Sequence, residues 1–181
     1  MVGKSRSGLV VVLVLVAGCS VGAPPDDTAP PSSAAAPSPQ QASPTPSAED
    51  LAGREALAAY RGMWADFVTA GTTSDWQSPD LGRHATGVAL TNLSRGLYAD
   101  SANGLVTRGA PVLSPEASSV EPARVVVTDC GDSTNWLKYR EDGSLATAGP
   151  GGRRLINAVV ERQSDGSWKV SDYGVQGIGS C

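Results

Sequence analysis

Histidine chemistry in this chain depends on one side chain, because His84 is the single histidine in the sequence. A zinc site of the usual kind needs several histidine or cysteine ligands at short spacings. A Ser-His-Asp triad would also need His84, yet no Gly-x-Ser-x-Gly segment precedes a predicted helix. The sequence therefore predicts no metal and no cofactor, and we expect His84 to pair with Asp80, one helical turn earlier.

The glycine-rich segment 149–154, which ends in two arginines, is the nearest approach to a phosphate-binding loop. It lacks the Gly-x-x-x-x-Gly-Lys-Ser/Thr pattern and precedes a predicted strand rather than a helix. We interpret it as a flexible turn beside solvated arginines. Asp129 and Asp132 lie close together in the sequence, but two carboxylates are too few for a calcium site.

The N-terminus has the pattern of an export signal. Lys4 and Arg6 precede an unbroken apolar run over residues 9–17. That run is too short to cross a bilayer, which takes about 20 apolar residues. Basic residues followed by a short apolar core are typical of a secretory signal peptide.

A cysteine follows the apolar core, in the segment Leu15-Val16-Ala17-Gly18-Cys19. The segment resembles the lipobox of bacterial lipoproteins, in which a branched aliphatic residue and two small residues precede a cysteine. The resemblance implies that Cys19 carries a diacylglycerol and begins the mature protein, which two acyl chains would hold at the outer face of the cell membrane. An ordinary signal peptide, or a cytosolic protein with an apolar start, is the alternative.

The segment after Cys19 is predicted to be a stalk. Eight of the 13 prolines fall between Pro24 and Pro46, among Ser, Ala, Gln and Thr and without any aromatic residue. Such a segment buries too little apolar surface to offset its ordering entropy, and it favours extended polyproline geometry. The predicted organisation is a signal peptide over 1–18, a lipidated stalk over 19–48 and one domain over 49–181. A proline-rich ligand for a partner is the alternative interpretation of the stalk.

The charge of the chain excludes one class of function, and its cysteine content predicts a disulfide. The chain has 14 basic and 18 acidic residues, a formal net charge of −4, which argues against nucleic-acid binding. Besides Cys19, only Cys130 and Cys181 remain, and a pair of cysteines in an oxidising compartment predicts a disulfide. Reactive thiols or metal ligands are the alternative, but no Cys-x-x-Cys or Cys/His spacing favours them.

The first half of the domain has helical periodicity. Ser47 followed three residues later by Asp50 resembles a capping box, and Gly71 is expected to close that helix. Ser78-Pro79 opens a second predicted helix, which ends at Gly104. The apolar face of the first helix consists of Leu57, Tyr60, Trp64 and Phe67.

The second half has the alternation of strands. The predicted strands cover 105–112, 123–130, 135–140, 155–162 and 168–175, and Asp165-Gly166 predicts a hairpin between the last two. In the last strand, Trp168 and Val170 share one parity whereas Tyr173 has the other. This switch predicts a β-bulge near Ser171-Asp172.

Helices followed by strands indicate an α+β domain, with two or three helices packed on a curved antiparallel sheet of four to five strands. Four further segments carry a family resemblance: 83–87, 104–109, 126–130 and 168–170. With them, the stretch from Trp76 to Cys181 resembles a group of secreted lipoproteins from high-GC Gram-positive bacteria. The order of elements resembles the cone-shaped nuclear-transport-factor-two-like fold, also called ketosteroid-isomerase-like, which hosts enzymes, binders and interaction modules alike.

Enzymes of that fold use a buried Asp or His as a base and a Tyr or an acid as an oxyanion donor. The resemblance makes the polar and aromatic residues of the domain candidates for a pocket, with core or rim packing as the alternative for each. Trp76, in the connection between the helices, is expected to cap the pocket mouth, meet a partner or pack as a staple. The candidate pocket residues are Tyr60, Trp76, His84, Asp129, Tyr139 and Tyr173.

None of these candidates belongs to a recognisable catalytic motif, so no catalytic residue is assigned. We expect a non-enzymatic, lipid-anchored extracytoplasmic domain that binds an envelope protein or a small ligand. A small-molecule isomerase or dehydratase that uses the cone pocket is the alternative. A dry pocket with a carboxyl beside a tyrosine hydroxyl would favour the enzyme, and a pocket filled by Trp and Leu would favour the binding domain.

The lipobox resemblance generates a first prediction. Replacing Cys19 by alanine should prevent lipidation and move the protein from the membrane to the soluble fraction, because no acyl chain would then anchor it. Detergent partitioning of cells that express either form measures the change. Membrane retention of Cys19→Ala equal to that of the wild type would refute the lipid anchor.

Overall fold

A computed structural model describes residues 45–146 and 150–181, so the predicted signal peptide, Cys19 and nearly all of the predicted stalk lie outside the described residues. Helix α1 (Ala48–Gly71) begins where the sequence predicts it. Ser47 Oγ accepts a hydrogen bond from the Asp50 backbone N–H at 3.0 Å, and the Asp50 carboxylate accepts one from the Ser47 backbone N–H at 3.1 Å. This capping box satisfies two N–H groups that the helix itself leaves unpaired.

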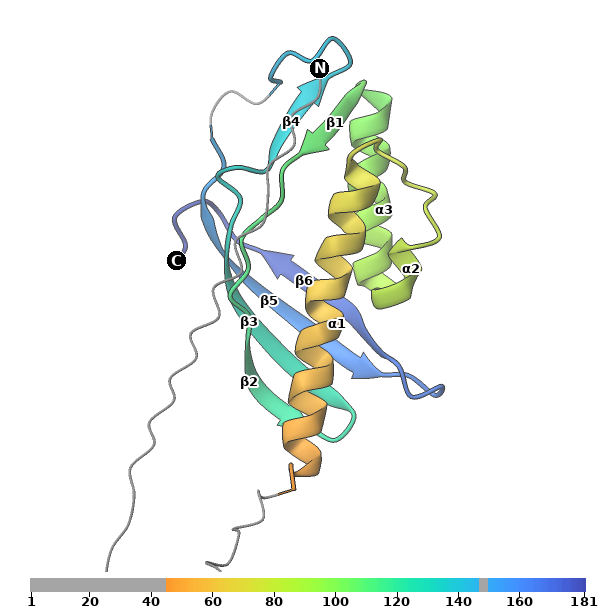
Figure 1. Ribbon diagram of the computed structural model, residues 1–181, viewed down its shortest axis with the longest axis vertical. Coiled ribbons are helices and arrows are strands. Elements are labelled where there is room, and N and C mark those ends of the chain that lie inside the picture. The colour runs from red at the N-terminus through yellow and green to blue at the C-terminus, as the bar shows by residue number, and fades with distance from the viewer. Residues whose placement is uncertain (1–44, 147–149) are drawn as a thin grey trace, which may run out of the picture. The chain divides into compact units, whose positions relative to one another are not determined.

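One face of α1 lies across the main sheet (Figure 1). Three small residues on this face are buried, which lets the helix approach the strands closely: Ala52, Ala56 and Ala59. Tyr60 and Met63 are fully buried beside them and fill the remaining space. The strands contribute branched apolar side chains to the same core, among them Val125, Val127, Val160 and Val170.

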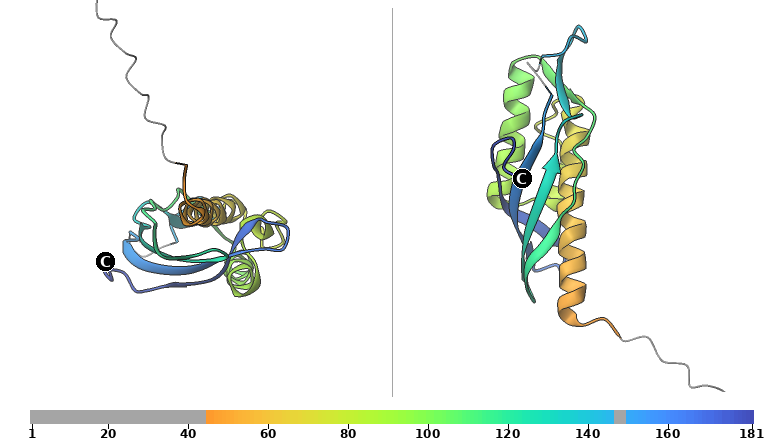
Figure 2. Two further views of the ribbon diagram at one scale, coloured as in Figure 1. Left: turned by 90° about the horizontal axis from the view of Figure 1, so that it is seen from below. Right: turned by 90° about the vertical axis from the view of Figure 1, so that its left-hand side faces the viewer.

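The main sheet is antiparallel and has the strand order β2-β3-β5-β6. Its strands are β2 (Glu116–Glu121), β3 (Arg124–Asp132), β5 (Arg153–Arg162) and β6 (Trp168–Val175). The views in Figure 2 show that the sheet is curved. The predicted hairpin joins β5 to β6, with Gly166 at a φ of 87° in its turn.

A second sheet pairs β1 (Leu105–Arg108) with β4 (Leu137–Arg140). The first strand was expected to continue to Val112, but Gly109 has a φ of 83° and ends it, so that Val112 forms only an isolated bridge. Strand β2 was missed altogether. Its sequence is polar, with a single β-branched residue at Val120, and it forms a strand because the edge of β3 is available for pairing.

The predicted second helix is wrong as a single element. The structure has α2 (Leu81–His84) and α3 (Gly87–Ala102), separated by extended backbone at Ala85 and Thr86. Ala85 forms a parallel bridge with Val170 of β6, and the Thr86 backbone N–H donates to the Val170 carbonyl at 2.9 Å. These bonds to the sheet replace helical ones and interrupt the helix.

The predicted β-bulge in β6 is confirmed. Val159 pairs with Asp172 while Val160 pairs with Val170, which leaves Ser171 as the extra residue. A bulge shifts the alternation of side chains by one position. Tyr173 therefore lies on the core side of the sheet with Trp168 and Val170, although its sequence parity differs.

Three helices packed on antiparallel strands confirm the predicted α+β class. The disulfide between Cys130 and Cys181 is also present, with the two Cα atoms 5.9 Å apart. None of the helices in the described part of the chain is long and apolar enough to span a membrane.

The disulfide supplies the second prediction. Cys181→Ser should lower the free energy of unfolding by about 2–4 kcal/mol, because the bridge restricts the unfolded chain and holds the C-terminal segment to the sheet. Urea denaturation, monitored by tryptophan fluorescence, measures the difference. The control is the wild type under reducing conditions, which should match the variant. Equal stability of oxidised wild type and variant would contradict the prediction.

Candidate functional site

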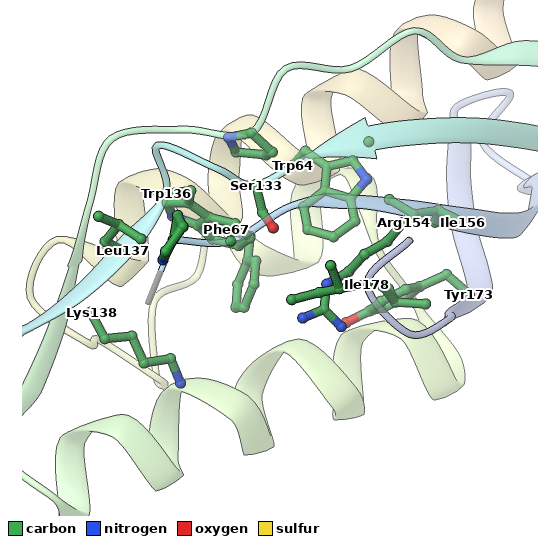
Figure 3. Close-up of a pocket in the computed structure, with 15 residues that line it drawn as sticks. Trp64, Phe67, Ser133, Trp136, Leu137, Lys138, Arg154, Ile156, Tyr173 and Ile178 are labelled. Atoms are coloured by element: carbon green, nitrogen blue, oxygen red, sulfur yellow. The ribbon is translucent and has the colours of Figure 1, made fainter. Parts of the chain in front are cut away.

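A cavity of about 390 Å³ opens between α1, the segment before β4, the start of β5 and the end of β6 (Figure 3). Its volume falls within the range of about 300–1,000 Å³ that is usual for small-molecule sites. The wall is mostly apolar and aromatic, with Trp64, Phe67, Trp136, Ile156, Tyr173 and Ile178 among the lining residues.

Trp64 is the centre of the aromatic wall. The centre of its ring lies 5.9 Å from the centre of the Trp136 ring, 5.9 Å from that of Tyr173 and 6.1 Å from that of Phe67. Each pair is in an edge-to-face arrangement. Phe67 and Trp136 also meet edge to face at 5.5 Å. Edge-to-face contacts hold aromatic rings in fixed relative orientations, so the wall is preformed.

Different elements bring these rings together. Trp64 and Phe67 lie one turn apart on α1, which places both on the same side of the helix. Trp136 comes from the turn directly before β4. Tyr173 reaches the wall only because the bulge at Ser171 turns its side chain to this side of the sheet.

The polar groups of the cavity are unevenly placed. Arg154 and Tyr173 lie at one side with Ile178, whereas Phe67, Trp136 and Lys138 lie toward the other (Figure 3). Lys138 forms an ion pair with Asp100 of α3. The cavity therefore has a separate polar group at each side of an aromatic middle.

Arg154 is half-buried, and one of its guanidinium N–H groups donates to the Gln176 carbonyl at 3.3 Å. Within residues 45–146 and 150–181, no carboxylate lies within 4.0 Å of this guanidinium. The hydroxyl of the nearby Tyr173 also has no hydrogen-bond partner among the described residues. Burial raises the pKa of Tyr173, so its hydroxyl stays protonated and can donate.

The C-terminal segment closes this side of the cavity. The Gln176 backbone N–H donates to the Leu155 carbonyl at 2.9 Å, and the Gly179 N–H donates to the Arg153 carbonyl at 2.8 Å. Ile178, between them, lines the cavity. The disulfide from Cys181 to β3 holds the end of this segment in place.

Two of the candidate pocket residues meet in the core instead of the cavity. The Tyr60 hydroxyl donates to Asp129 Oδ2 at 3.0 Å, and the Ser114 backbone N–H donates to Asp129 Oδ1 at 2.8 Å. Tyr60 is 0% exposed and Asp129 is 1% exposed, and neither lines the cavity. Burial, followed by the charge of Asp129, raises the pKa of Tyr60 well above its usual range.

His84 has a different partner from the expected one. Its Nδ1 lies 2.7 Å from Asp66 Oδ2 of α1, while Asp80 is paired with Arg83. The ring lies so close to Gly62 that a Cβ there would be 2.7 Å from ring atoms. The pair therefore ties α2 to α1.

Trp76 and Tyr139 lie away from the cavity. Trp76 is 38% exposed and meets Tyr98 of α3 edge to face at 5.4 Å. Tyr139 lies on β4, where the Arg108 guanidinium is 5.0 Å from the centre of its ring. Of the six candidates, Tyr173 is the one that lines the cavity.

Sequence reasoning missed Arg154, Phe67 and Trp136 as cavity residues. Phe67 was expected in the core, Trp136 in an alternating strand, and Arg154 on a solvated turn. Arg154 lies on β5 and pairs across the sheet with Gly131 of β3. A cation near the start of an apolar strand is the feature of the sequence that could have indicated Arg154. That feature points to a cavity only once the position of the C-terminal segment beside Arg154 is known.

Comparison with known proteins gives no family. Neither a protein-family model nor a curated protein matches the chain. Solved structures with a related shape include the intermembrane space region of the chloroplast protein ARC6, at 16% identity and a TM-score of 0.49, over 68% of this chain and 95% of that one.

Two further structures are a protein from Catenulispora acidiphila and a ketosteroid isomerase-like protein from Erwinia carotovora atroseptica. The first is 18% identical over 66% of this chain and 89% of that one, with a TM-score of 0.45. The second is 12% identical over 67% of this chain and 92% of that one, with a TM-score of 0.41. Similarity at this level concerns shape, and it assigns no chemistry.

The buried pair gives the third prediction. Tyr60→Phe should lower the free energy of unfolding by about 1–3 kcal/mol, because Asp129 loses a buried donor. The raised pKa of Tyr60 adds a pH dependence. The contribution of Tyr60 to the stability of the wild type is fully present below pH 10.0, which is the pKa of a tyrosine in the unfolded chain. This contribution is lost as pH rises above that value, since the unfolded chain then releases a proton that the folded chain keeps.

In Tyr60→Phe this alkaline loss should be smaller, with the remainder due to Tyr173 and other groups. Urea denaturation at several pH values from neutral to alkaline measures both effects. Tyr98→Phe is the matched control, because Tyr98 is 55% exposed and should change neither quantity. Parallel pH profiles for wild type and Tyr60→Phe would contradict the assignment.

Proposed function

We propose that this protein is a lipid-anchored, extracytoplasmic binding domain whose cavity takes a small, mainly apolar ligand with an anionic group. The observation that carries the proposal is the cavity with an aromatic wall and Arg154 at one side. Aromatic rings contribute apolar contact, and a guanidinium recognises a carboxylate through paired N–H donors.

The charge pattern supports an anionic rather than a cationic ligand. Arg154 has no carboxylate partner in the described residues, and no acidic side chain lines the cavity. Lys138, the other cation of the wall, is compensated by Asp100. An anion beside Arg154 would therefore balance a charge that the chain itself leaves uncompensated.

Features of the sequence support the proposed cellular setting. The lipobox-like segment ending at Cys19 supports an anchor on the outer face of the membrane, and the proline-rich stretch after it supports a stalk. The disulfide between Cys130 and Cys181 fits an oxidising compartment. Assignment to a nuclear-transport-factor-two-like lipoprotein group belongs to the same proposal.

An isomerase would need its base and its hydrogen-bond donor in contact with substrate. Tyr60 and Asp129 are a tyrosine and a carboxylate in hydrogen-bond contact, but they are sealed in the core behind Trp64 and do not line the cavity. The cavity wall instead presents aromatic rings and the guanidinium of Arg154, which are groups that bind apolar and anionic parts of a ligand. This contrast favours the binding role over the enzymatic alternative.

The fourth prediction tests the charge preference. In calorimetric titration, protein purified from membranes into lipid nanodiscs should bind 4-phenylbutanoate more tightly than uncharged 4-phenylbutanamide. Arg154→Gln should weaken binding of the acid by about 10- to 100-fold, the worth of a hydrogen-bonded charge, and should leave the amide unaffected.

Arg162→Gln is the matched control, because Arg162 lies at the opposite end of β5 and is exposed. It should bind both compounds like the wild type. Equal affinity of the wild type for acid and amide would refute the anion site. Native mass spectrometry of protein from its own cells would then show whether another ligand remains bound.

A further inference from the structure

Most polar side chains around the large cavity are already occupied or shielded. Ser133 Oγ accepts a hydrogen bond from the Gly152 N–H at 3.2 Å and donates one to the Gly152 carbonyl at 3.1 Å. Lys138 forms its ion pair within the chain. The indole nitrogens of Trp64 and Trp136 are buried away from any open space, so they present no donor to a ligand.

Arg154 and Tyr173 differ from these residues, because among the described residues no other side chain meets either polar group. The Arg154 guanidinium has one bond, at 3.3 Å, to the Gln176 carbonyl, and the Tyr173 hydroxyl has none. Both residues are half-buried, yet their unpaired polar atoms are not sealed as the indole nitrogens are. Each therefore presents a donor to the cavity that both residues line.

The two side chains lie on the same face of the sheet. Arg154 has the parity of Ile156 and Ala158 on β5, and both of these are buried. Tyr173 pairs with Ala158 across β5 and β6, and the bulge turns it to the same face. In Figure 3 the Tyr173 hydroxyl points toward the Arg154 guanidinium, beside Ile178. The free donors of the cavity thus converge at one side.

We propose that the Tyr173 hydroxyl is the second donor to the anionic group that Arg154 binds, and that this group is a carboxylate. The inference rests on the proposed function and narrows it to carboxylic acids with an apolar body. A carboxylate has one negative charge, which matches the one uncompensated cation of the described wall. It also has two oxygens, one for the guanidinium and one for the hydroxyl. The second charge and third oxygen of a phosphate would lack a partner there.

The test removes the hydroxyl alone. Tyr173→Phe keeps the ring that packs against Trp64, so the melting temperature of the ligand-free protein should be unchanged or higher. In the nanodisc titration the variant should bind 4-phenylbutanoate about tenfold more weakly, the worth of a hydrogen bond to a charged group. Binding of 4-phenylbutanamide should fall by about threefold or less, because its oxygen is uncharged. Protein-free nanodiscs correct for partitioning of the ligands into lipid.

A double-mutant cycle shows whether the two residues hold the same group. If they do, the hydroxyl matters less once the guanidinium is gone. Tyr173→Phe should then cost the acid about threefold or less in the Arg154→Gln background, against about tenfold in the wild type. Tyr98→Phe is the matched control, because Tyr98 is 55% exposed on α3 and does not line this cavity. It should bind like the wild type.

The head group is tested with 3-phenylpropylphosphonate, which has the same body as 4-phenylbutanoate. At a pH at which it carries two charges, it should bind the wild type at least about tenfold more weakly than the acid.

The outcomes separate the two proposals. Suppose that the acid binds through Arg154. If Tyr173→Phe binds it like the wild type, or the two substitutions act independently, or the phosphonate binds as tightly, this inference is overturned alone. A lower melting temperature of Tyr173→Phe with equal losses for acid and amide assigns its hydroxyl to packing and also overturns it. If the wild type binds the acid no better than the amide, both the proposed function and this inference are refuted.

Discussion

The contact between α1 and the sheet is the constraint on which the rest of the domain depends. Alanines let the helix lie close to the strands, and the bond between Tyr60 and Asp129 crosses that interface inside the core. A buried polar pair has to be satisfied, so it fixes where α1 lies along β3. Trp64 and Phe67 follow on the same helix, and their position over the cavity is therefore set by a bond that takes no part in the cavity itself.

The two irregularities of the backbone depend on each other. The helix break at Ala85 and Thr86 is bonded to Val170, and the bulge in β6 begins at the next residue, Ser171. Gly87 has a φ of 54°, and a Cβ there would lie 3.4 Å from the Ser171 carbonyl oxygen. The break that divides the predicted helix thus packs against the bulge at Ser171, which turns Tyr173 toward the cavity wall.

Local patterns in the sequence are sufficient to predict the capping box at Ser47, the hairpin at Gly166, the bulge at Ser171 and the disulfide. Each depends on neighbouring residues or on a pair with no competitor. The helix break, strand β2 and the partner of His84 were not predicted, because each is decided by a segment distant in sequence. The cavity follows the same rule: Tyr173 was a candidate from its own strand, whereas Arg154 becomes a site residue only when the C-terminal segment lies beside it.

Arg154 differs from two other basic side chains near the core. Arg83 faces Asp66 and Lys138 faces Asp100, so each is matched by a carboxylate, whereas Arg154, like the half-buried Lys169, has only a backbone carbonyl as its partner in the described residues. A guanidinium drawn partly out of water loses hydration, and one carbonyl bond restores only part of it. A domain that needed this position only for packing would be served better by an apolar side chain, which would extend the wall formed by Ile156 and Ile178. Keeping a cation there is favourable when an anion occupies the cavity, and this asymmetry is the physical reason for proposing a binding site there.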